Sequence, residues 1–177
     1  APAPAPVDPD RTYRIASGNG RALAQAGSGS ATSSVPAVSH ARWAAWSIVA
    51  DGDGSYRIVN ADTGRALGVD SSSTGSRAWA TRPTVTPLGS HGPTVGQQWF
   101  IVRNASHPGT YRLVNRYSGL VLGLSGHHDR RAETTPLRTW TNHTGDTVGG
   151  GRTAAEQTLT FVPTGHGHHG AARATSR

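Results

Sequence analysis

The sequence predicts an all-β protein whose three related units close into a single barrel. A segment that begins with Tyr-Arg and ends in Leu occurs at residues 13–23, 56–67 and 111–122. Each copy has a short run rich in Tyr and β-branched residues, a polar turn closed by Gly and a second apolar run, which is typical of a β-hairpin. Units of this kind cannot each bury an apolar face, so they must share one core. Three are too few for an ordinary propeller, and we therefore expect a closed threefold barrel.

Each unit ends on a second shared pattern, a large apolar residue that begins a short β-type run. These residues are Trp46, Trp99 and Leu159. Gln97 and Gln157 stand two places ahead of the last two, whereas Ala44 holds that place in the first unit. The pattern therefore marks the end of every unit, in a decayed form where the Gln or the Trp is replaced.

The complete motif is Tyr-Arg-[Ile/Leu]-Val-Asn-x-x-[Thr/Ser]-Gly-x-x-Leu followed by Gln-x-Trp, and it resembles the ricin B-type β-trefoil. That lectin fold also occurs as a family 13-like carbohydrate-binding module on secreted glycosidases. The resemblance covers residues 12–164 and implies a β-trefoil with three repeats around a pseudo-threefold axis. It also implies that the Gln amide ties a loop backbone while the Trp closes the barrel bottom. An amide offers donors and an acceptor, and a buried indole supplies apolar area, so the pair is structural.

Length and composition fit one domain with a modest core. The chain has 177 residues, of which 34% are hydrophobic and 6% aromatic. It has no Cys, so a disulfide framework is excluded. No run approaches the roughly 20 apolar residues of a membrane-spanning helix. Because the chain begins with Ala rather than Met, we expect a processed mature chain or an excised domain.

The formal charge is +7, and every basic residue is Arg. Such a charge is compatible with nucleic acid or an acidic polysaccharide as a partner. The arginines are scattered, however, and three of them belong to the repeated Tyr-Arg step. They form no basic stripe, so we expect solvated strand positions and no nucleic-acid partner.

Composition divides the chain into three parts. Residues 1–10 are rich in Ala and Pro and predict an extended linker with no means of packing. Residues 11–164 form the predicted trefoil domain, and residues 165–177 form a flexible tail rich in His and Arg. The predicted repeats are residues 11–53, 54–104 and 105–164.

The segments between the hairpins and the repeat ends differ. In repeat one, the low-complexity segment 24–37 has little to bury, so we expect a long irregular surface excursion. Asp-Gly-Asp-Gly at 51–54 has two acidic positions of a calcium loop but lacks the other ligands, which favours a tight turn. Repeat two continues with Asp70 and a Pro/Gly/Thr excursion at 82–96. Repeat three carries a long Gly/Thr-rich segment at 141–155.

Sugar-binding sites combine a flat aromatic face with a carboxylate or amide that takes paired hydroxyls. In ricin-type repeats, as the resemblance implies, the carboxylate is an Asp directly after the Leu that ends the hairpin. The aromatic residue follows a dozen or more residues later, and an Asn precedes the Gln of Gln-x-Trp. In this chain the Asp place holds Ala24, Gly68 and Gly123, so the usual Asp is missing from all three repeats.

Repeat three is the first candidate for a carbohydrate-binding site. It offers Trp140 at the aromatic place and Arg138 where an amide often lies. Glu156 holds the Asn place, directly beside Gln157. The resemblance therefore places all four residues at a sugar site.

Repeat two is the second candidate. Asp70 and Trp79 each lie two places from the expected position, and a two-place shift keeps a side chain on the same face of a strand. We therefore expect Asp70 and Trp79 to converge on one site, whereas repeat one offers nothing beyond Trp43. The alternative is that Trp79 and Trp140 are half-buried packing residues on a trefoil that no longer binds sugar.

The sequence does not predict an active site. Its ten carboxylates are scattered, with no pair in the context of a glycosidase, and no Gly-x-Ser-x-Gly elbow is present. His127, His128 and Asp129 form the densest polar cluster, but no distant ligand accompanies them. We therefore predict a chain without catalytic activity, metal or cofactor.

Three functional hypotheses remain. The first is a monomeric carbohydrate-binding module, accessory to a secreted enzyme that degrades polysaccharides, and the resemblance points toward galactosides or pentose-containing polysaccharides. The second is a trefoil that has lost sugar binding and serves as a protein-interaction or spacer domain through segments 24–37, 84–96 and 141–155. The third is a basic domain that binds acidic polymers, and its binding would collapse at moderate salt.

Overall fold

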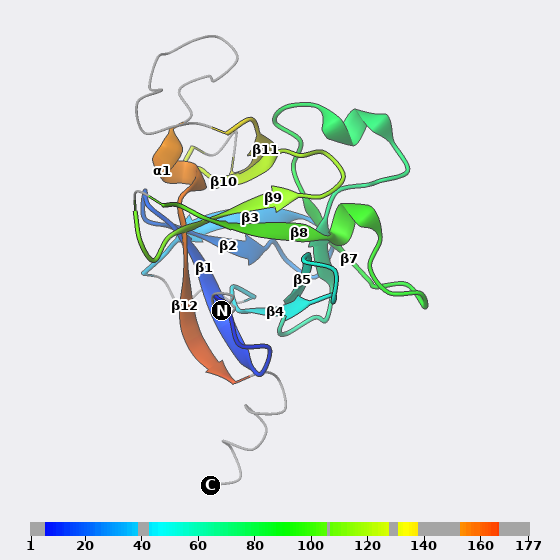
Figure 1. Ribbon diagram of the computed structural model, residues 1–177, viewed down its shortest axis with the longest axis horizontal. Coiled ribbons are helices and arrows are strands. Elements are labelled where there is room, and N and C mark those ends of the chain that lie inside the picture. The colour runs from blue at the N-terminus through cyan, green and yellow to red at the C-terminus, as the bar shows by residue number, and fades with distance from the viewer. Residues whose placement is uncertain (1–5, 39–42, 106, 128–130, 138–152, 167–177) are drawn as a thin grey trace, which may run out of the picture.

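The computed structural model describes residues 6–38, 43–105, 107–127, 131–137 and 153–166 (Figure 1). Within these residues, twelve strands join one sheet. Repeat one contains β1 (Arg11–Ser17), β2 (Arg21–Gln25), β3 (Thr32–Pro36) and β4 (Trp46–Ala50). Repeat two contains β5 (Tyr56–Asn60), β6 (Ala66–Gly68), β7 (Thr84–Thr86) and β8 (Trp99–Arg103). Repeat three contains β9 (Tyr111–Asn115), β10 (Val121–Leu124), β11 (Ala132–Thr135) and β12 (Leu159–His166).

The first and last strands of the three repeats form a closed barrel. Strand β1 pairs with β4, β4 with β5, and β5 with β8. Strand β8 pairs with β9, β9 with β12, and β12 returns to β1. The middle strands form one cap hairpin per repeat, β2–β3, β6–β7 and β10–β11. This arrangement confirms the predicted β-trefoil (Figure 1).

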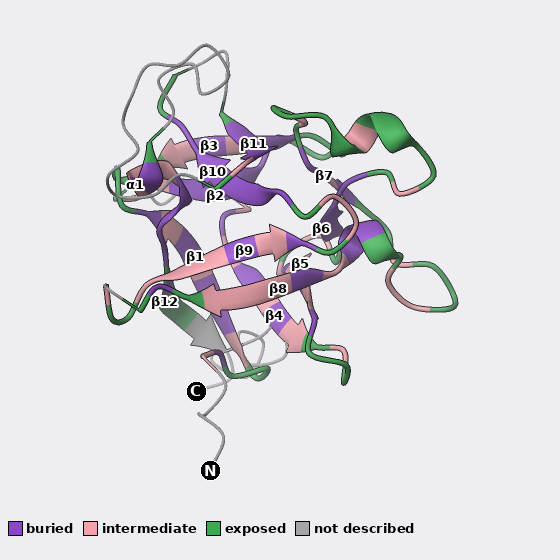
Figure 2. Cartoon of the chain, turned by 45° about the horizontal axis from the view of Figure 1, so that its top comes forward, coloured by how far each residue is buried: buried purple, intermediate pink, exposed green. Residues whose placement is uncertain are grey.

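The core is built from equivalent positions of the three repeats (Figure 2). Nine of these side chains have no exposed surface: Ile15, Ile58, Leu113, Leu23, Leu67, Leu122, Trp46, Trp99 and Leu159. The two indoles are also hydrogen-bonded, since Trp46 Nε1 donates to Leu23 O at 3.0 Å and Trp99 Nε1 to Leu67 O at 2.9 Å. Each indole therefore ties the end of its repeat to that repeat's own hairpin.

The Asn of the repeated motif links one repeat to the next. Asn60 and Asn115 are fully buried, and the Oδ1 of each accepts the N–H groups two and three residues ahead. Their Nδ2 groups reach back, Asn60 to Trp43 O at 2.8 Å and Asn115 to Gly96 O at 3.0 Å. One Asn side chain of the motif thus stabilises its own hairpin turn and also binds the backbone of the preceding repeat.

Segment 24–37 is not the irregular excursion that its composition predicts. Most of it belongs to the cap hairpin, where β2 and β3 pair over five positions. Thr32 and Ser34 of β3 are buried, whereas Ser33 and Val35 between them are half-buried. The prediction was wrong because small polar side chains were taken as a sign of exposure, although every second residue of β3 is buried and small side chains fit such a strand.

The segment before β1 also differs from the prediction that residues 1–10 have no means of packing. Val7 is buried and belongs to the hydrophobic core. The Asp8 N–H donates to the Tyr13 hydroxyl at 2.8 Å, and the Arg11 N–H donates to Asp8 O at 3.1 Å. One apolar residue among prolines is therefore enough to anchor the end of this segment to the barrel.

Three short helices complete the described part of the chain. They are η1 (Thr74–Arg77), η2 (Val95–Gln97) and α1 (Ala154–Gln157). Over the described residues, no helix is both long and apolar enough to cross a membrane. Most of the predicted segment 141–155 and nearly all of the predicted tail lie outside the described residues.

Candidate functional site

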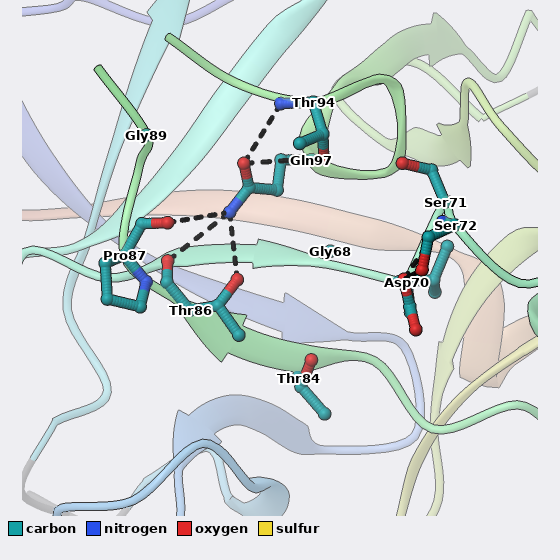
Figure 3. A pocket seen from close by; sticks show the side chains of 11 residues that line it. Gly68, Asp70, Ser71, Ser72, Thr84, Thr86, Pro87, Gly89, Thr94 and Gln97 are labelled. Carbon is teal, nitrogen blue, oxygen red and sulfur yellow. Dashed lines mark hydrogen bonds between the residues drawn. The ribbon is translucent and has the colours of Figure 1, made fainter. Parts of the chain in front are cut away.

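The cap hairpin of repeat two carries a pocket of about 510 Å³ (Figure 3). One wall is the end of β6 with residues 69–72, and the opposite wall is β7 with Pro87 and Gly89. Thr94, the N-cap of η2, and Gln97 complete the lining. All of these residues belong to repeat two, so the pocket is a feature of one repeat rather than of the barrel as a whole.

Gln97 supports the pocket by hydrogen bonds to its walls rather than by presenting groups to a ligand. Its side chain is buried, and Nε2 donates to Thr86 Oγ1 at 2.9 Å and to the carbonyls of Thr86 and Pro87 at 3.4 Å (Figure 3). Its Oε1 accepts the Thr94 N–H at 3.0 Å. These bonds confirm the prediction that the Gln of Gln-x-Trp ties a loop backbone.

Asp70 supplies the pocket with a negative charge. It is exposed, and its Oδ1 accepts the Ser72 N–H at 2.9 Å and the Ser72 hydroxyl at 2.5 Å (Figure 3). The Ser72 hydroxyl first, and then the Ser72 N–H, lower the pKa of Asp70 below its ordinary value of 3.8. Among the described residues both bonds fall on Oδ1, so Oδ2 can accept hydroxyls from a ligand.

The packing of two glycines explains why repeat two has no Asp at the place after the hairpin Leu. A Cβ on Gly68 would lie 2.6 Å from Gly96 O and 2.9 Å from the Gln97 Cα. A Cβ on Gly96 would lie 2.0 Å from Val69 O. The backbones therefore meet too closely for a side chain at position 68, and Asp70, two residues later, brings a carboxylate to the same pocket.

Trp79 does not share this pocket with Asp70, contrary to the expected convergence. Its side chain is 53% exposed and lies outside the pocket lining. The next residue, Ala80, has a left-handed φ of 71°, and its N–H donates to Thr134 O at 2.9 Å. The Thr134 N–H in turn donates to Thr81 O at 2.8 Å. The β6–β7 connection thus carries Trp79 to the cap strand of repeat three, exposed rather than packed.

The same connection is also held by the hairpin turn of repeat three. The Tyr117 hydroxyl donates to Ser73 O at 3.1 Å, and the Arg77 guanidinium lies 4.5 Å from the centre of the Tyr117 ring. Sequence reasoning missed this contact because the residues belong to different repeats. It also missed Ser72 and Thr84 as pocket residues, since nothing in their types distinguishes them from other polar loop residues.

In repeat three, Trp140 and Arg138 lie outside the described residues. Glu156 lies in α1 and is half-buried. Gln157 is buried, and its Nε2 donates to Thr135 Oγ1 at 2.9 Å and to Pro136 O at 2.8 Å. Gln157 therefore supports its cap hairpin as Gln97 supports the pocket of repeat two.

Segment 51–54 forms the predicted turn. Asp53 Oδ1 accepts the Ser55 hydroxyl at 2.6 Å and the Ser55 N–H at 3.0 Å, and Asp53 Oδ2 lies 2.5 Å from the Arg116 guanidinium. The Ser55 hydroxyl and then Arg116 hold the pKa of Asp53 well below its usual range. The described residues contain no group of three side chains suited to a metal, while His128 and Asp129 lie outside them.

Comparison with known families identifies one match. The model of the family described as "Ricin-type beta-trefoil lectin domain-like" matches residues 6–82 and 46–140 in two overlapping stretches. Together these stretches include all three cap hairpins and the whole pocket of repeat two. No curated protein matches the chain.

Solved structures with the same fold are distant in sequence. A designed threefold symmetric protein, ThreeFoil, has a TM-score of 0.64 and 21% identity over 85% of this chain and 97% of its own. The ricin B-like lectin of Macrolepiota procera, solved with lactose, has a TM-score of 0.64 and 20% identity over 88% and 97%. A GlcNAcα1-4Gal-releasing endo-β-galactosidase from Clostridium perfringens has a TM-score of 0.62 and 16% identity, and the match covers 87% of this chain but 32% of that enzyme.

Proposed function

The chain belongs to the ricin-type β-trefoil lectin domain-like family, and on this premise we propose that it is a non-catalytic carbohydrate-binding module with a sugar site in repeat two. The pocket with the Asp70 carboxylate at its edge is the observation that carries the proposal. A carboxylate whose direction is fixed can accept two neighbouring hydroxyls of a sugar ring, which gives both affinity and orientation. Thr84, at the pocket wall, adds a hydroxyl that donates or accepts.

Trp79 adds a second contact for a longer ligand. An exposed indole offers a flat apolar face to a sugar ring. It sits on the same connection as Asp70, and this connection is tied at Ser73, Arg77 and Ala80. Because a fixed platform loses little entropy on binding, a saccharide that extends beyond the pocket gains from Trp79 without a large ordering cost.

We further propose that the module is family 13-like and accessory to a secreted enzyme that degrades polysaccharides. Support comes from the C. perfringens endo-β-galactosidase, of which this chain matches about a third. Weak sites on a module raise the residence time of an attached enzyme on a polymer. A galactoside is the first ligand to test, since the M. procera lectin was solved with lactose, and a pentose-containing polysaccharide is the second. The module is proposed to be a monomer, and sedimentation analysis of the purified protein would test this oligomeric state.

A glycan array and a set of insoluble polysaccharides would identify the ligand, and titration calorimetry would locate the site. We expect Asp70→Asn to weaken binding roughly tenfold to a hundredfold, because a hydrogen bond to a charged group contributes about 1.5–3 kcal/mol. Trp79→Ala should weaken binding of long saccharides more than of short ones. Asp62→Asn is the matched control, since Asp62 is an exposed carboxylate in the hairpin turn of the same repeat.

Two results would contradict the proposal. If folded wild-type protein bound no glycan, the chain would be an interaction or spacer domain instead. If Asp62→Asn weakened binding as much as Asp70→Asn, the effect would come from net charge, and the pocket would not be the sugar site.

A further inference from the structure

Four neighbouring strands of the barrel carry arginines and no carboxylate. Strand β12 pairs with β1 on one side and with β9 on the other, and β9 pairs with β8. None of these strands contains Asp or Glu. Arg14 and Arg112 each precede a fully buried core residue, so their side chains project from the outer side of the barrel (Figure 2). We refer to the outer surface of these four strands as the barrel wall.

The arginine of the Tyr-Arg step has the same cross-strand neighbour in all three repeats. It pairs with a valine each time: Arg14 with Val162, Arg57 with Val49, and Arg112 with Val102. Paired residues on adjacent strands project to the same face of a sheet. The aliphatic stem of each arginine therefore lies beside a valine, and the guanidinium is carried to the outer surface.

Of these three arginines, Arg57 is neutralised by a carboxylate. It forms an ion pair of 3.4 Å with Asp51, the residue directly after β4. Asn104 follows β8 in the same way, and its N–H donates to Thr110 O as the Asp51 N–H donates to Ser55 O. Asn104 is neutral, and its Nδ2 donates to Thr110 Oγ1 at 3.0 Å. The place of the neutralising carboxylate is therefore taken by an amide beside Arg112.

The junction of the last and first strands lacks this carboxylate as well. Two residues after Val162, at the place of Asp51, the chain has Thr164, whose hydroxyl is 2.7 Å from the Thr12 hydroxyl. Over the described residues, neither Arg14 nor Arg112 forms an ion pair with a carboxylate. The barrel wall thus presents two positive charges that the fold does not neutralise.

Two further arginines border the barrel wall. Arg103 is exposed at the end of β8, with its guanidinium 5.9 Å from the centre of the Tyr111 ring. Arg116 follows β9 and lies 5.9 Å from the centre of the Phe100 ring, but it is paired with Asp53. Arg103 therefore adds to the positive charge of this surface, whereas Arg116 adds little.

The spacing of the charges indicates the kind of ligand. Arg14 and Arg112 lie on strands separated by β12, so they are about 10 Å apart across the strands, given a strand spacing of about 4.8 Å. An extended polymer with separated negative charges suits this arrangement. Double-stranded DNA carries one charge per about 1.7 Å, which is far denser than the barrel wall. Carboxylates or sulfates carried on the sugars of a polysaccharide match it better.

We propose that the barrel wall binds an acidic polysaccharide through Arg14 and Arg112. This binding is separate from the sugar site proposed for repeat two, which lies on a cap hairpin and carries the negative charge of Asp70. The two surfaces therefore differ in the ligands that they attract. Acidic sugars bind to the barrel wall, and neutral sugars bind in the pocket.

Titration of the full chain with polygalacturonate at low salt tests this proposal, with neutral dextran as the control polymer. Arg14→Gln and Arg112→Gln should each weaken binding of polygalacturonate roughly threefold, and the double variant roughly tenfold. The slope of the logarithm of affinity against the logarithm of salt concentration should fall by about one for each arginine removed. Arg65→Gln is the matched control, because it removes the same charge from the hairpin turn of repeat two and should leave affinity nearly unchanged.

Asn104→Asp gives a second test that keeps every arginine. It introduces at the end of β8 the carboxylate that neutralises Arg57 at the end of β4. This variant should therefore weaken binding as much as Arg112→Gln, and it takes that variant's place if Arg112→Gln does not fold. Asp70→Asn should leave the binding of polygalacturonate unchanged.

Three results would overturn the proposal. Wild type that does not bind polygalacturonate would show that the barrel wall is an ordinary solvated surface. An equal loss in Arg65→Gln would assign the binding to net charge. Tighter binding of duplex DNA that depends on Arg14 and Arg112 would make nucleic acid the ligand. None of these results concerns the repeat-two pocket, which is tested separately with neutral saccharides.

Discussion

Asp70 shows how a carboxylate can reach the pocket from a position two residues after the one where ricin-type repeats carry their Asp. The residue directly after the hairpin Leu is Gly68, where a Cβ would meet Gly96 O at 2.6 Å. Two residues later the chain has left the strand and turns back through the hydrogen bonds from Ser72 to Asp70. That turn directs the carboxylate to the pocket and stabilises its charged form. The close backbone contact at Gly68 and the carboxylate of Asp70 are thus compatible, because two different residues provide them.

The pKa of Asp70 leads to a pH prediction for sugar binding. Because the folded-state pKa is lowered from 3.8, the carboxylate stays ionised above that value, and protonation follows only as pH falls through the lower pKa. Binding should therefore be constant from about pH 8 to about pH 5 and be lost only in stronger acid. Titration of the Asp70 carboxyl by NMR, beside calorimetry across this range, makes the measurement.

Ser72→Ala is the informative variant for this prediction. It removes the hydroxyl that is the largest cause of the shift, so the pKa of Asp70 should rise toward 3.8. The loss of binding should begin at a correspondingly higher pH. An Asp70 pKa that does not change in Ser72→Ala would show that the hydroxyl is not what stabilises the charge.

At the scale of the element, the cap hairpins of repeats two and three are both held by a Gln side chain. They differ in how closely they approach the short helix, η2 or α1, that precedes the last barrel strand of the repeat. In repeat two, the N–H of Val69 donates to Gly96 O at 3.0 Å, and both Gly68 and Gly96 are required for that approach. In repeat three, α1 stands in place of η2. A Cβ added to Gly123 would make only ordinary van der Waals contacts there. The same hydrogen-bonding framework therefore tolerates two different spacings.

This difference predicts opposite results for equivalent substitutions. Gly68→Ala should destabilise the protein by about 1–3 kcal/mol, because the added methyl collides with backbone atoms that cannot move independently. Gly123→Ala should change the free energy of unfolding by less than about 0.5 kcal/mol. Denaturant unfolding of both variants makes the comparison, and Gly123→Ala is the control. Equal effects would mean that the close approach in repeat two relaxes without cost.

Sequence patterns predicted the elements that repeat and failed where neighbouring repeats meet. Tyr-Arg hairpins and Gln97 were predicted correctly because they depend on local periodicity and on one amide. The position of Trp79 was not, because it is set by hydrogen bonds of Ala80 and Thr81 to Thr134 in another repeat.

On the scale of the whole molecule, the net charge of the chain and the charge of the repeat-two pocket have opposite signs. The chain has a formal charge of +7, all of it from Arg. Yet the repeat-two pocket presents the carboxylate of Asp70. Arginines of the described region are used elsewhere, as in the Arg116–Asp53 and Arg57–Asp51 ion pairs. A positive net charge therefore does not identify the ligand, because the local chemistry of the repeat-two pocket decides what binds there.

This contrast predicts how salt affects binding. Hydrogen bonds from neutral hydroxyls to a carboxylate carry no long-range attraction, so affinity for a neutral saccharide should change less than about twofold between roughly 50 and 500 mM salt. An acidic polymer attracted by the arginines would instead lose affinity steeply over the same range, as counterion release requires. Binding of neutral and sulfated polysaccharides measured side by side at both salt concentrations distinguishes the two modes. Strong salt-sensitive binding of the sulfated polymer, combined with no binding of the neutral one, would contradict the repeat-two pocket as the sugar site and favour the scattered arginines as the binding groups.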